Sequence, residues 1–191
     1  MPGQWRLVAR DAFNGMLLWR RDMKNWGSHA WSYWTESHAA RFNHPLHVRK
    51  RLIAKGNRVY TTLGFDSPVT ALDAATGESV MTYEGTDYTD EFVLFDGVLY
   101  VAVNDSPQRP WPGAGVRPEA TGELPPASQK QVWAIDAAAG KILWKASPFV
   151  GSAAKIDRMA SMRHLNLTVA ETGVFLIDEK PFFGLDRESG E

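Results

Sequence analysis

The chain has no cysteine, which excludes a disulfide framework and any site that depends on a thiolate. Neither sign of charge dominates, because 21 Lys and Arg residues stand against 22 Asp and Glu residues. The densest basic run covers only residues 49–51, and no basic stripe of the kind that nucleic-acid binding requires is present. We therefore expect no nucleic-acid partner.

Two further patterns are missing from the sequence. No apolar run has the length of a membrane-spanning segment, so we expect no transmembrane segment. Residues 1–5 lack the basic and apolar regions of a signal peptide, which carries no information if the chain is an internal fragment. Aromatic residues, by contrast, are plentiful and include 8 Trp, which favours a well-buried core.

One short phrase occurs four times along the chain. An apolar run leads to an Asp, a Gly follows four residues later, and in the three complete copies a bulky apolar residue stands four residues further on. The copies contain Asp11, Gly15 and Trp19, then Asp73, Gly77 and Met81, then Asp136, Gly140 and Trp144, and finally Asp186 and Gly190. Repetition at this scale predicts a propeller or a solenoid.

Each phrase predicts a β-hairpin with a defined turn. The Gly stands where the backbone needs a positive φ, which glycine adopts at little steric cost. The Asp carboxylate is placed to accept hydrogen bonds from backbone N–H groups of the same turn. The terminal Trp is large enough to bridge to a neighbouring unit, which is how a repeat buries a face that it cannot bury alone.

The segments between the phrases supply a second hairpin for each unit. Residues 51–63, 91–103 and 167–177 are rich in Val, Tyr, Phe and Ile and are interrupted by Gly-Asn, Asp-Gly or Thr-Gly turns. Two hairpins give a unit of four antiparallel strands, A to D, with a length of about 40 residues. This is the size of one propeller blade.

The phrase Ala-x-Asp-x-x-(Thr/Asn)-Gly-x-x-x-Trp resembles the repeat of the pyrroloquinoline-quinone-type β-propellers, in which the Trp docks between blades. Met81 departs from this pattern, and the Trp position of the last copy lies beyond Glu191. The resemblance implies a periplasmic or other extracytoplasmic location. That family includes quinoprotein alcohol dehydrogenases, the outer-membrane assembly scaffold lipoprotein and many repeat proteins that bind no quinone.

The sequence thus predicts an all-β fold, a partial β-propeller with two complete blades and two partial ones. We expect residues 1–191 to form a single propeller fragment with blade parts at residues 1–23, 48–84, 91–147 and 165–191. The alternative is a complete short protein that closes its ring by oligomerisation. As a fragment, the chain would leave apolar faces and strand edges of its partial blades uncovered, and it would need the rest of its propeller as a partner.

Three connections are longer than their counterparts in the other repeats, at residues 22–48, 105–130 and 147–164. All three join strand D to A or strand B to C, so antiparallel geometry predicts that they share one face, opposite the turns that end in Gly. Loops gathered on one side of a rigid scaffold are where function usually resides. We therefore expect any ligand to bind on this loop face.

The best candidates for that face are Trp31, Trp34, His38, Arg158 and His164. The first insertion forms either a pocket wall lined by aromatic residues and histidines or a cover over the blades. The proline-rich second insertion is a lid or a surface excursion, and the third places arginines against an anionic ligand or against solvent. No metal-binding signature is present, so we expect no metal site.

Two functions remain open at this stage. The first is a non-catalytic scaffold that binds a protein or a small ligand on the loop face and needs no cofactor. The second is part of a quinoprotein dehydrogenase, which would use pyrroloquinoline quinone and calcium with a catalytic Asp. The adjacent cysteine pair that resembles a hallmark of those enzymes is missing, and no arrangement singles out one acidic residue among Asp66, Asp87, Asp90 and Asp105.

Overall fold

The computed structural model describes residues 5–23, 51–64, 67–104, 129–149, 165–178 and 182–191, and these residues form β-strands and turns without an α-helix. Accordingly, the described part of the chain contains no helix that is long and apolar enough to cross a membrane. The strands of the two complete blades are β3 (Leu52–Lys55), β4 (Arg58–Thr62), β5 (Val69–Asp73) and β6 (Ser79–Thr82), then β7 (Glu91–Phe95), β8 (Val98–Asn104), β9 (Lys130–Asp136) and β10 (Ile142–Phe149).

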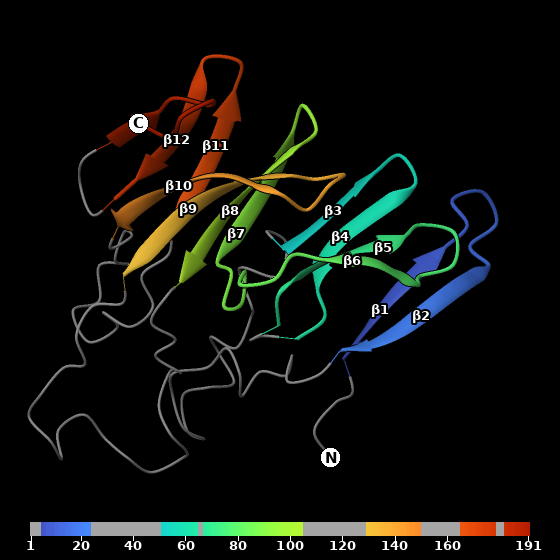
Figure 1. The fold of residues 1–191 in the computed structure, drawn as a ribbon. Coiled ribbons are helices and arrows are strands. Elements are labelled where there is room, and N and C mark those ends of the chain that lie inside the picture. The colour runs from blue at the N-terminus through green and yellow to red at the C-terminus, as the bar shows by residue number, and fades with distance from the viewer. Residues whose placement is uncertain (1–4, 24–50, 65–66, 105–128, 150–164, 179–181) are drawn as a thin grey trace, which may run out of the picture.

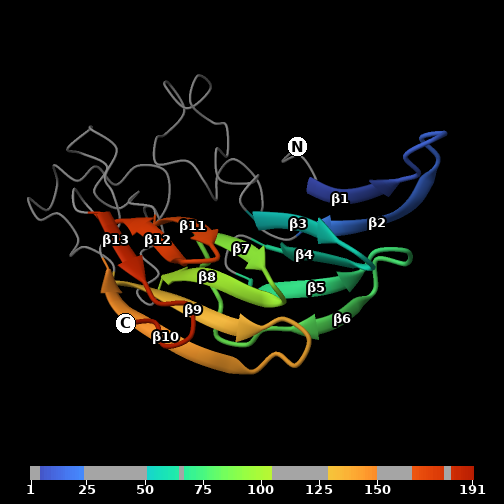
Figure 2. The ribbon, with the colours of Figure 1, turned by 90° about the horizontal axis from the view of Figure 1, so that it is seen from above.

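The two partial blades flank the complete ones. They consist of β1 (Trp5–Arg10) and β2 (Leu17–Met23) at the N-terminal end, and of β11 (Asn166–Ala170), β12 (Gly173–Ile177) and β13 (Phe182–Leu185) at the C-terminal end. Within every sheet each strand pairs antiparallel with its neighbour in sequence. The four sheets lie side by side in chain order, as Figures 1 and 2 show. The chain is therefore an all-β partial β-propeller, as the repeat predicts.

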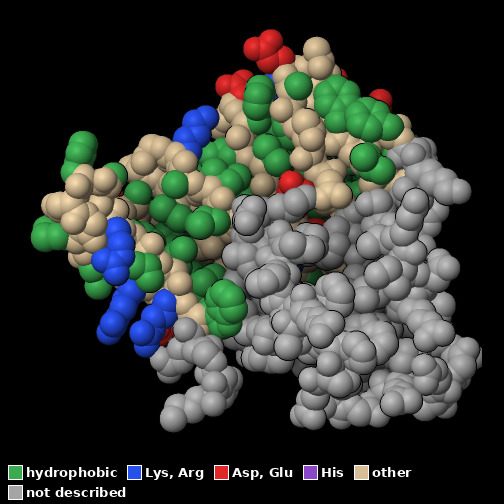
Figure 3. Space-filling view, turned by 180° about the vertical axis from the view of Figure 1, so that it is seen from behind, with side chains coloured by type: hydrophobic (Ala, Val, Ile, Leu, Met, Phe, Trp, Pro, Cys, Tyr) green, Lys and Arg blue, Asp and Glu red, His purple; other side chains and the backbone are tan. Residues whose placement is uncertain are grey.

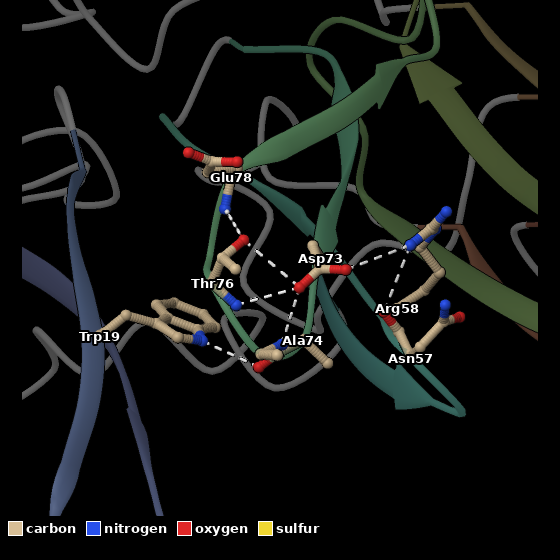
Figure 4. A network of polar contacts seen from close by, with 8 residues as sticks. Trp19, Asn57, Arg58, Asp73, Ala74, Thr76 and Glu78 are labelled. Carbon is tan, nitrogen blue, oxygen red and sulfur yellow. Dashed lines mark hydrogen bonds and ion pairs between the residues drawn. The ribbon is translucent and has the colours of Figure 1, made fainter.

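The Asp carboxylate of each repeated phrase closes its turn. In the second copy, Asp73 Oδ1 accepts the N–H of Ala75 at 2.9 Å and that of Thr76 at 3.0 Å (Figure 4). These hydrogen bonds favour the ionised carboxylate, so the N–H of Thr76 and then that of Ala75 lower the pKa of Asp73. Equivalent hydrogen bonds are accepted by Asp11, Asp136 and Asp186.

The Gly that ends each turn has the left-handed conformation that the sequence predicts. The φ angles are 72° at Gly15, 73° at Gly77, 71° at Gly140 and 77° at Gly190. We call residues 11–15, 73–77, 136–140 and 186–190 the four docking turns, because three of them receive a side chain from the preceding blade.

Trp19 of β2 packs on the docking turn 73–77 of the next blade. Its indole Nε1 donates a hydrogen bond to the Ala74 carbonyl at 2.8 Å (Figure 4). A Cβ atom placed on Gly77 would lie 2.6 Å from the Trp19 ring, so only glycine leaves room for the indole. Trp19 is 9% exposed, which places it in the core between blades.

Trp144 of β10 repeats this arrangement on the docking turn 186–190. Its Nε1 donates to the Arg187 carbonyl at 2.7 Å, and a Cβ on Gly190 would lie 2.6 Å from its ring. Trp144 is 7% exposed. The inter-blade docking of the Trp residues is thus a feature of the structure as well as of the sequence pattern.

The Met81 copy keeps the packing but divides the docking between two residues. The Met81 sulfur lies 3.0 Å from a Cβ placed on Gly140, so the thioether takes the place of the indole. The hydrogen bond comes instead from Tyr83, whose hydroxyl donates to the Ala137 carbonyl at 2.7 Å. Ala137 follows Asp136 as Ala74 follows Asp73, so Tyr83 supplies the donor that methionine lacks.

Replacing Tyr83 with phenylalanine is therefore expected to lower the free energy of unfolding by about 0.5–1.5 kcal/mol, the usual net value of one hydrogen bond. Burial raises the pKa of Tyr83 to about 12, so the hydroxyl remains a donor at neutral pH. Chemical denaturation of the variant and the original chain measures the difference. The double variant Met81→Trp, Tyr83→Phe should be more stable than Tyr83→Phe alone, because the indole restores the hydrogen-bond donor. If it is not, Tyr83 does not replace the donor that the Trp supplies in the other copies.

Two hydrophobic clusters fill the spaces between neighbouring sheets. One lies between the β3–β6 and β7–β10 blades and includes Tyr60, Val69, Tyr83, Leu99 and Ile135. The other lies between the β7–β10 blade and the β11–β13 sheet and includes Tyr100, Val132, Trp144, Leu165 and Leu176. The β7–β10 blade is consequently packed on both of its sides, whereas the β3–β6 blade has one cluster on one side and the docked Trp19 on the other.

Candidate functional site

The strand ends that flank the three inserted loops lie at one end of the blades. Strand β8 ends at Asn104, and β9 begins at Lys130, which pairs directly with Asn104. Arg51 directly precedes β3, and Leu165 directly precedes β11. The four docking turns join the opposite ends of the strands, so the described bases of the loops and the docking turns lie on opposite faces (Figure 1).

A buried carboxylate joins the bases of the second and third loops. Asp90, at the start of the β7–β10 blade, is 7% exposed, and its Oδ2 forms an ion pair and hydrogen bond with the Nζ of Lys130, which is 1% exposed. The same Oδ2 accepts the backbone N–H of Leu165 at 3.3 Å. Asp90 therefore holds together Lys130, the last residue of the second insertion, and Leu165, which directly follows the third.

The base of the first loop belongs to the same electrostatic group. Arg51 is 4% exposed, and burial lowers its pKa to about 10, while the charge of Asp90 raises it. The pKa remains far above neutral, so Arg51 keeps its positive charge. We call Arg51, Asp90 and Lys130, together with the Leu165 N–H, the Asp90 cluster. It brings one residue from the base of each insertion into the field of a single carboxylate.

The short connection between β6 and β7 positions Asp90. The Thr86 hydroxyl accepts the N–H of Val69 at 2.8 Å and donates to the Tyr83 carbonyl at 2.6 Å. The Thr89 hydroxyl donates to the Thr86 carbonyl at 2.6 Å, and the Asp90 N–H donates to the Ala102 carbonyl at 2.8 Å. Thr86 and Thr89 are both 0% exposed. This uninserted connection is thus a rigid support beside the longer loops.

Glu91 extends the contact between the last two sheets. One carboxylate oxygen of Glu91 accepts the backbone N–H of Leu167 at 3.3 Å. Together with the hydrogen bond from the Leu165 N–H to Asp90, this contact joins the start of β7 to the start of β11 at two points. At each point a carboxylate accepts a backbone N–H. The loop face is therefore braced across the blade interface by carboxylates that accept backbone donors.

The ligand-face residues that the sequence predicts are Trp31, Trp34, His38, Arg158 and His164, and all five lie outside the described residues. They remain predictions. From the sequence, Asp90 is named among several acidic residues without a role, and Arg51 is treated only as part of a short basic run. Arg51 and Lys130 are instead buried. Arg51 lies three residues after the first insertion and Lys130 ends the second, and this position at the base of a loop is the feature that could have identified them.

The described residues do not fit a calcium site. Calcium requires several carboxylate and carbonyl oxygens around one point. Among the residues that the structure describes, no three His, Asp or Glu side chains are close enough to hold a metal ion. The Asp90 carboxylate is paired with Lys130, so its charge is already neutralised. We therefore derive no quinone-dependent step from this part of the chain.

No family model matches the chain, and no curated protein shows significant sequence similarity to it. Solved structures do show similarity. The computationally designed protein Ika8 is 13% identical with a TM-score of 0.50, over 96% of this chain and 41% of Ika8. BamB from Moraxella catarrhalis is 17% identical with a TM-score of 0.44, over 97% of this chain and 56% of BamB.

Quinohemoprotein alcohol dehydrogenase ADHIIG from Pseudomonas putida HK5 is 20% identical with a TM-score of 0.42, over 73% of this chain and 19% of the enzyme. The chain thus spans between 19% and 56% of the length of these proteins. With its docking turns and four-stranded blades, the chain is similar in fold to pyrroloquinoline-quinone-type propellers. Likeness at such low identity concerns the fold and transfers no activity.

Proposed function

We propose that the chain is part of a non-catalytic β-propeller scaffold that binds a protein or a small ligand on the face formed by its inserted loops. The observation that supports this most directly is the Asp90 cluster, which gathers the bases of all three insertions around one buried carboxylate. Scaffolds that present binding loops commonly hold the loop bases rigidly. The extracytoplasmic location implied by the repeat belongs to this proposal.

A non-catalytic role fits the chemistry of the cluster. Asp90 Oδ2 is engaged by the Lys130 ammonium group and by the Leu165 N–H, and Arg51 lies in the field of the same carboxylate. These are the contacts of a carboxylate that holds neighbouring segments together. The Asp90 cluster is accordingly interpreted as a support for binding loops.

Site-specific crosslinking tests which face binds. Glu84, on the connection between β6 and β7, and Glu78, beside the docking turn 73–77, are both exposed and lie at opposite ends of the same blade. A photoreactive amino acid at position 84 should crosslink a partner or ligand in cell extract, and the same residue at position 78 should give the matched background. Crosslinks from position 78 alone would contradict a loop-face site.

Titration with pyrroloquinoline quinone and calcium distinguishes the scaffold from the dehydrogenase alternative. The scaffold proposal expects no saturable heat in calorimetry and no change in quinone absorbance when the two are added together to the chain. Stoichiometric binding that requires both calcium and quinone would favour the dehydrogenase. In that case the ligands would come from residues outside the described strands and turns.

A further inference from the structure

Two exposed positions of the docking turns carry different side chains in the four copies. The residue two places after the Asp is Phe13, Ala75, Ala138 or Glu188, and the residue after the Gly is Met16, Glu78, Lys141 or Glu191. All eight residues are exposed. Only the first copy has a large apolar side chain at both positions, and there Phe13 is 100% exposed and Met16 is 63% exposed.

Two leucines extend this apolar surface into β2. Leu17 and Leu18 are 50% and 51% exposed. The residues at the corresponding positions of the complete blades are also exposed, namely Ser79 and Val80 in β6 and Ile142 and Leu143 in β10. We call the four exposed apolar residues of the first copy the apolar tip: Phe13, Met16, Leu17 and Leu18.

Neighbouring blades do not cover the positions that form the apolar tip. The β7–β10 blade is packed on both sides, and the β3–β6 blade has a hydrophobic cluster on one side and the docked Trp19 on the other. The residues of both blades at the four corresponding positions nevertheless remain exposed. The exposure of the apolar tip is therefore a property of these positions in the repeat, and closing the ring would not bury it. Large apolar side chains gathered at such positions indicate a binding surface.

Arginines accompany the apolar tip. Arg10 donates from Nη1 to the carbonyl of Gly15 at 2.8 Å, which holds its positive charge at the turn, and Arg20 is exposed on β2. The hairpin Trp5–Met23 contains four Arg and two Asp, and no Lys or Glu. Figure 3 shows hydrophobic side chains at the outer end of this hairpin, on the left of the view, with Lys and Arg side chains beside them. The hairpin is thus apolar at its end and carries a net positive charge.

The shape of the hairpin favours insertion over flat docking. The turn between β1 and β2 stands clear of the neighbouring blade in both ribbon views (Figures 1 and 2). Leu17 and Leu18 are consecutive in a strand, so they point to opposite faces of the hairpin, and a flat partner would cover only one of them. Insertion into a lipid surface buries both. Apolar side chains then lie below the headgroups, and basic side chains meet anionic headgroups.

We propose that the β1–β2 hairpin binds a membrane surface that contains anionic lipid. The apolar tip enters the boundary between headgroups and acyl chains, with Phe13 foremost, and the guanidinium groups of Arg10 and Arg20 pair with lipid phosphates. The turn of this hairpin lies on the face opposite the inserted loops, so membrane binding leaves the loop face open. The proposal is independent of what the loop face binds.

Vesicle sedimentation of the 191-residue chain tests the proposal. The probes are vesicles of phosphatidylcholine alone and vesicles of equal amounts of phosphatidylcholine and phosphatidylglycerol. The chain should bind the mixed vesicles more tightly, and added salt should weaken this binding because it screens the attraction. Phe13→Ala should lower the partition coefficient about tenfold, because it removes the apolar area that enters the lipid. Equal binding to both kinds of vesicle at low salt would overturn the proposal.

Two matched controls locate the binding. Phe182→Ala makes the same change at a phenylalanine that is 67% exposed on the incomplete β11–β13 sheet, and it should leave the partition coefficient unchanged. Arg20→Gln should lower the partition coefficient about fivefold. Lys141→Gln, at an exposed position of another docking turn, should not lower it. An equal effect of either control and its counterpart would overturn the proposal, since the lipid would then bind uncovered sheet faces or any positive charge.

Fluorescence reports directly on insertion. The chain has no cysteine, so Phe13→Cys can carry an environment-sensitive dye at one position, and Ala138→Cys carries the same dye at the corresponding position of another docking turn. Mixed vesicles should shift the dye emission to shorter wavelength at position 13 but not at position 138. No shift at position 13, or equal shifts at both, would overturn the proposal. Dissociation of an oligomer upon Phe13→Ala without vesicles would also overturn it, because the apolar tip would then bind a second copy.

Discussion

Replacing Trp144 with alanine is expected to lower the free energy of unfolding by about 3–5 kcal/mol, the usual cost of removing a large buried aromatic side chain. The indole is 7% exposed, fills the space above Gly190 and donates a hydrogen bond to the Arg187 carbonyl. It also packs against Tyr100, with ring centroids 5.9 Å apart. The substitution removes all of these contacts and weakens the packing of the β11–β13 sheet against the blade before it.

Equilibrium denaturation in urea measures the loss, with Leu143→Ala as the matched control. Leu143 is the neighbour of Trp144 on β10 and is 48% exposed, so its truncation should cost much less. Trp144→Phe should fall between the two, because it keeps the ring but loses the donor. Similar effects of Leu143→Ala and Trp144→Ala would show that the interface between these blades does not depend on the docked indole.

The repeated phrase predicts more of this fold than the β-propensities of the individual residues would. The spacing from Asp73 to Gly77 specified the turn, and the spacing from Gly140 to Trp144 specified which side chain crosses to the next blade. Both are local patterns, since every residue involved is close in sequence. This is why the sequence alone predicts the turn conformation and which side chains dock, although Trp19 and Trp144 dock on residues 55 and 43 positions further along the chain.

The Asp90 cluster could not be predicted in the same way, because its members meet only in the folded chain. Asp90 and Lys130 are 40 residues apart, and Leu165 lies 75 residues after Asp90. A lysine at the start of a strand is normally solvated, so the sequence gives no reason to bury it. Its burial depends on the carboxylate of Asp90, which directly precedes the first strand of the blade.

The role of Tyr83 was missed for a related reason. The sequence showed that Met81 breaks the Trp pattern, but it did not show that a residue two positions later restores the lost donor. Tyr83 directly follows β6, and its N–H still donates to the Val69 carbonyl of β5 at 2.9 Å. The alternation of side chains along β6 therefore extends to Tyr83, which lies on the same side of the sheet as Met81 and can compensate for it. The Tyr83 hydroxyl reaches the Ala137 carbonyl, which belongs to the next blade.

Breaking the Asp90–Lys130 pair is expected to have an effect as large as the loss of Trp144. Lys130→Met removes the cation and leaves the Asp90 carboxylate buried without its closest counter-charge, and such changes typically cost about 3–5 kcal/mol. Asp90→Ala leaves the buried ammonium group of Lys130 in the same position. Urea denaturation measures both losses. The double variant Asp90→Leu, Lys130→Met should be more stable than either single variant, because no charge of the pair then remains uncompensated.

The matched control is the exposed ion pair between Arg6 and Asp22, whose side chains are 41% and 76% exposed. Removing Asp22 should cost less than about 1 kcal/mol, because solvent screens the pair. Hydrogen exchange then separates a local role from a global one. The Leu165 amide donates to Asp90, so in Asp90→Leu it should exchange faster, relative to global unfolding, than the Leu176 amide in the centre of the same sheet. Unchanged protection of Leu165 would show that Asp90 does not hold the base of the third loop, and the proposed arrangement of the loop face would lose its main support.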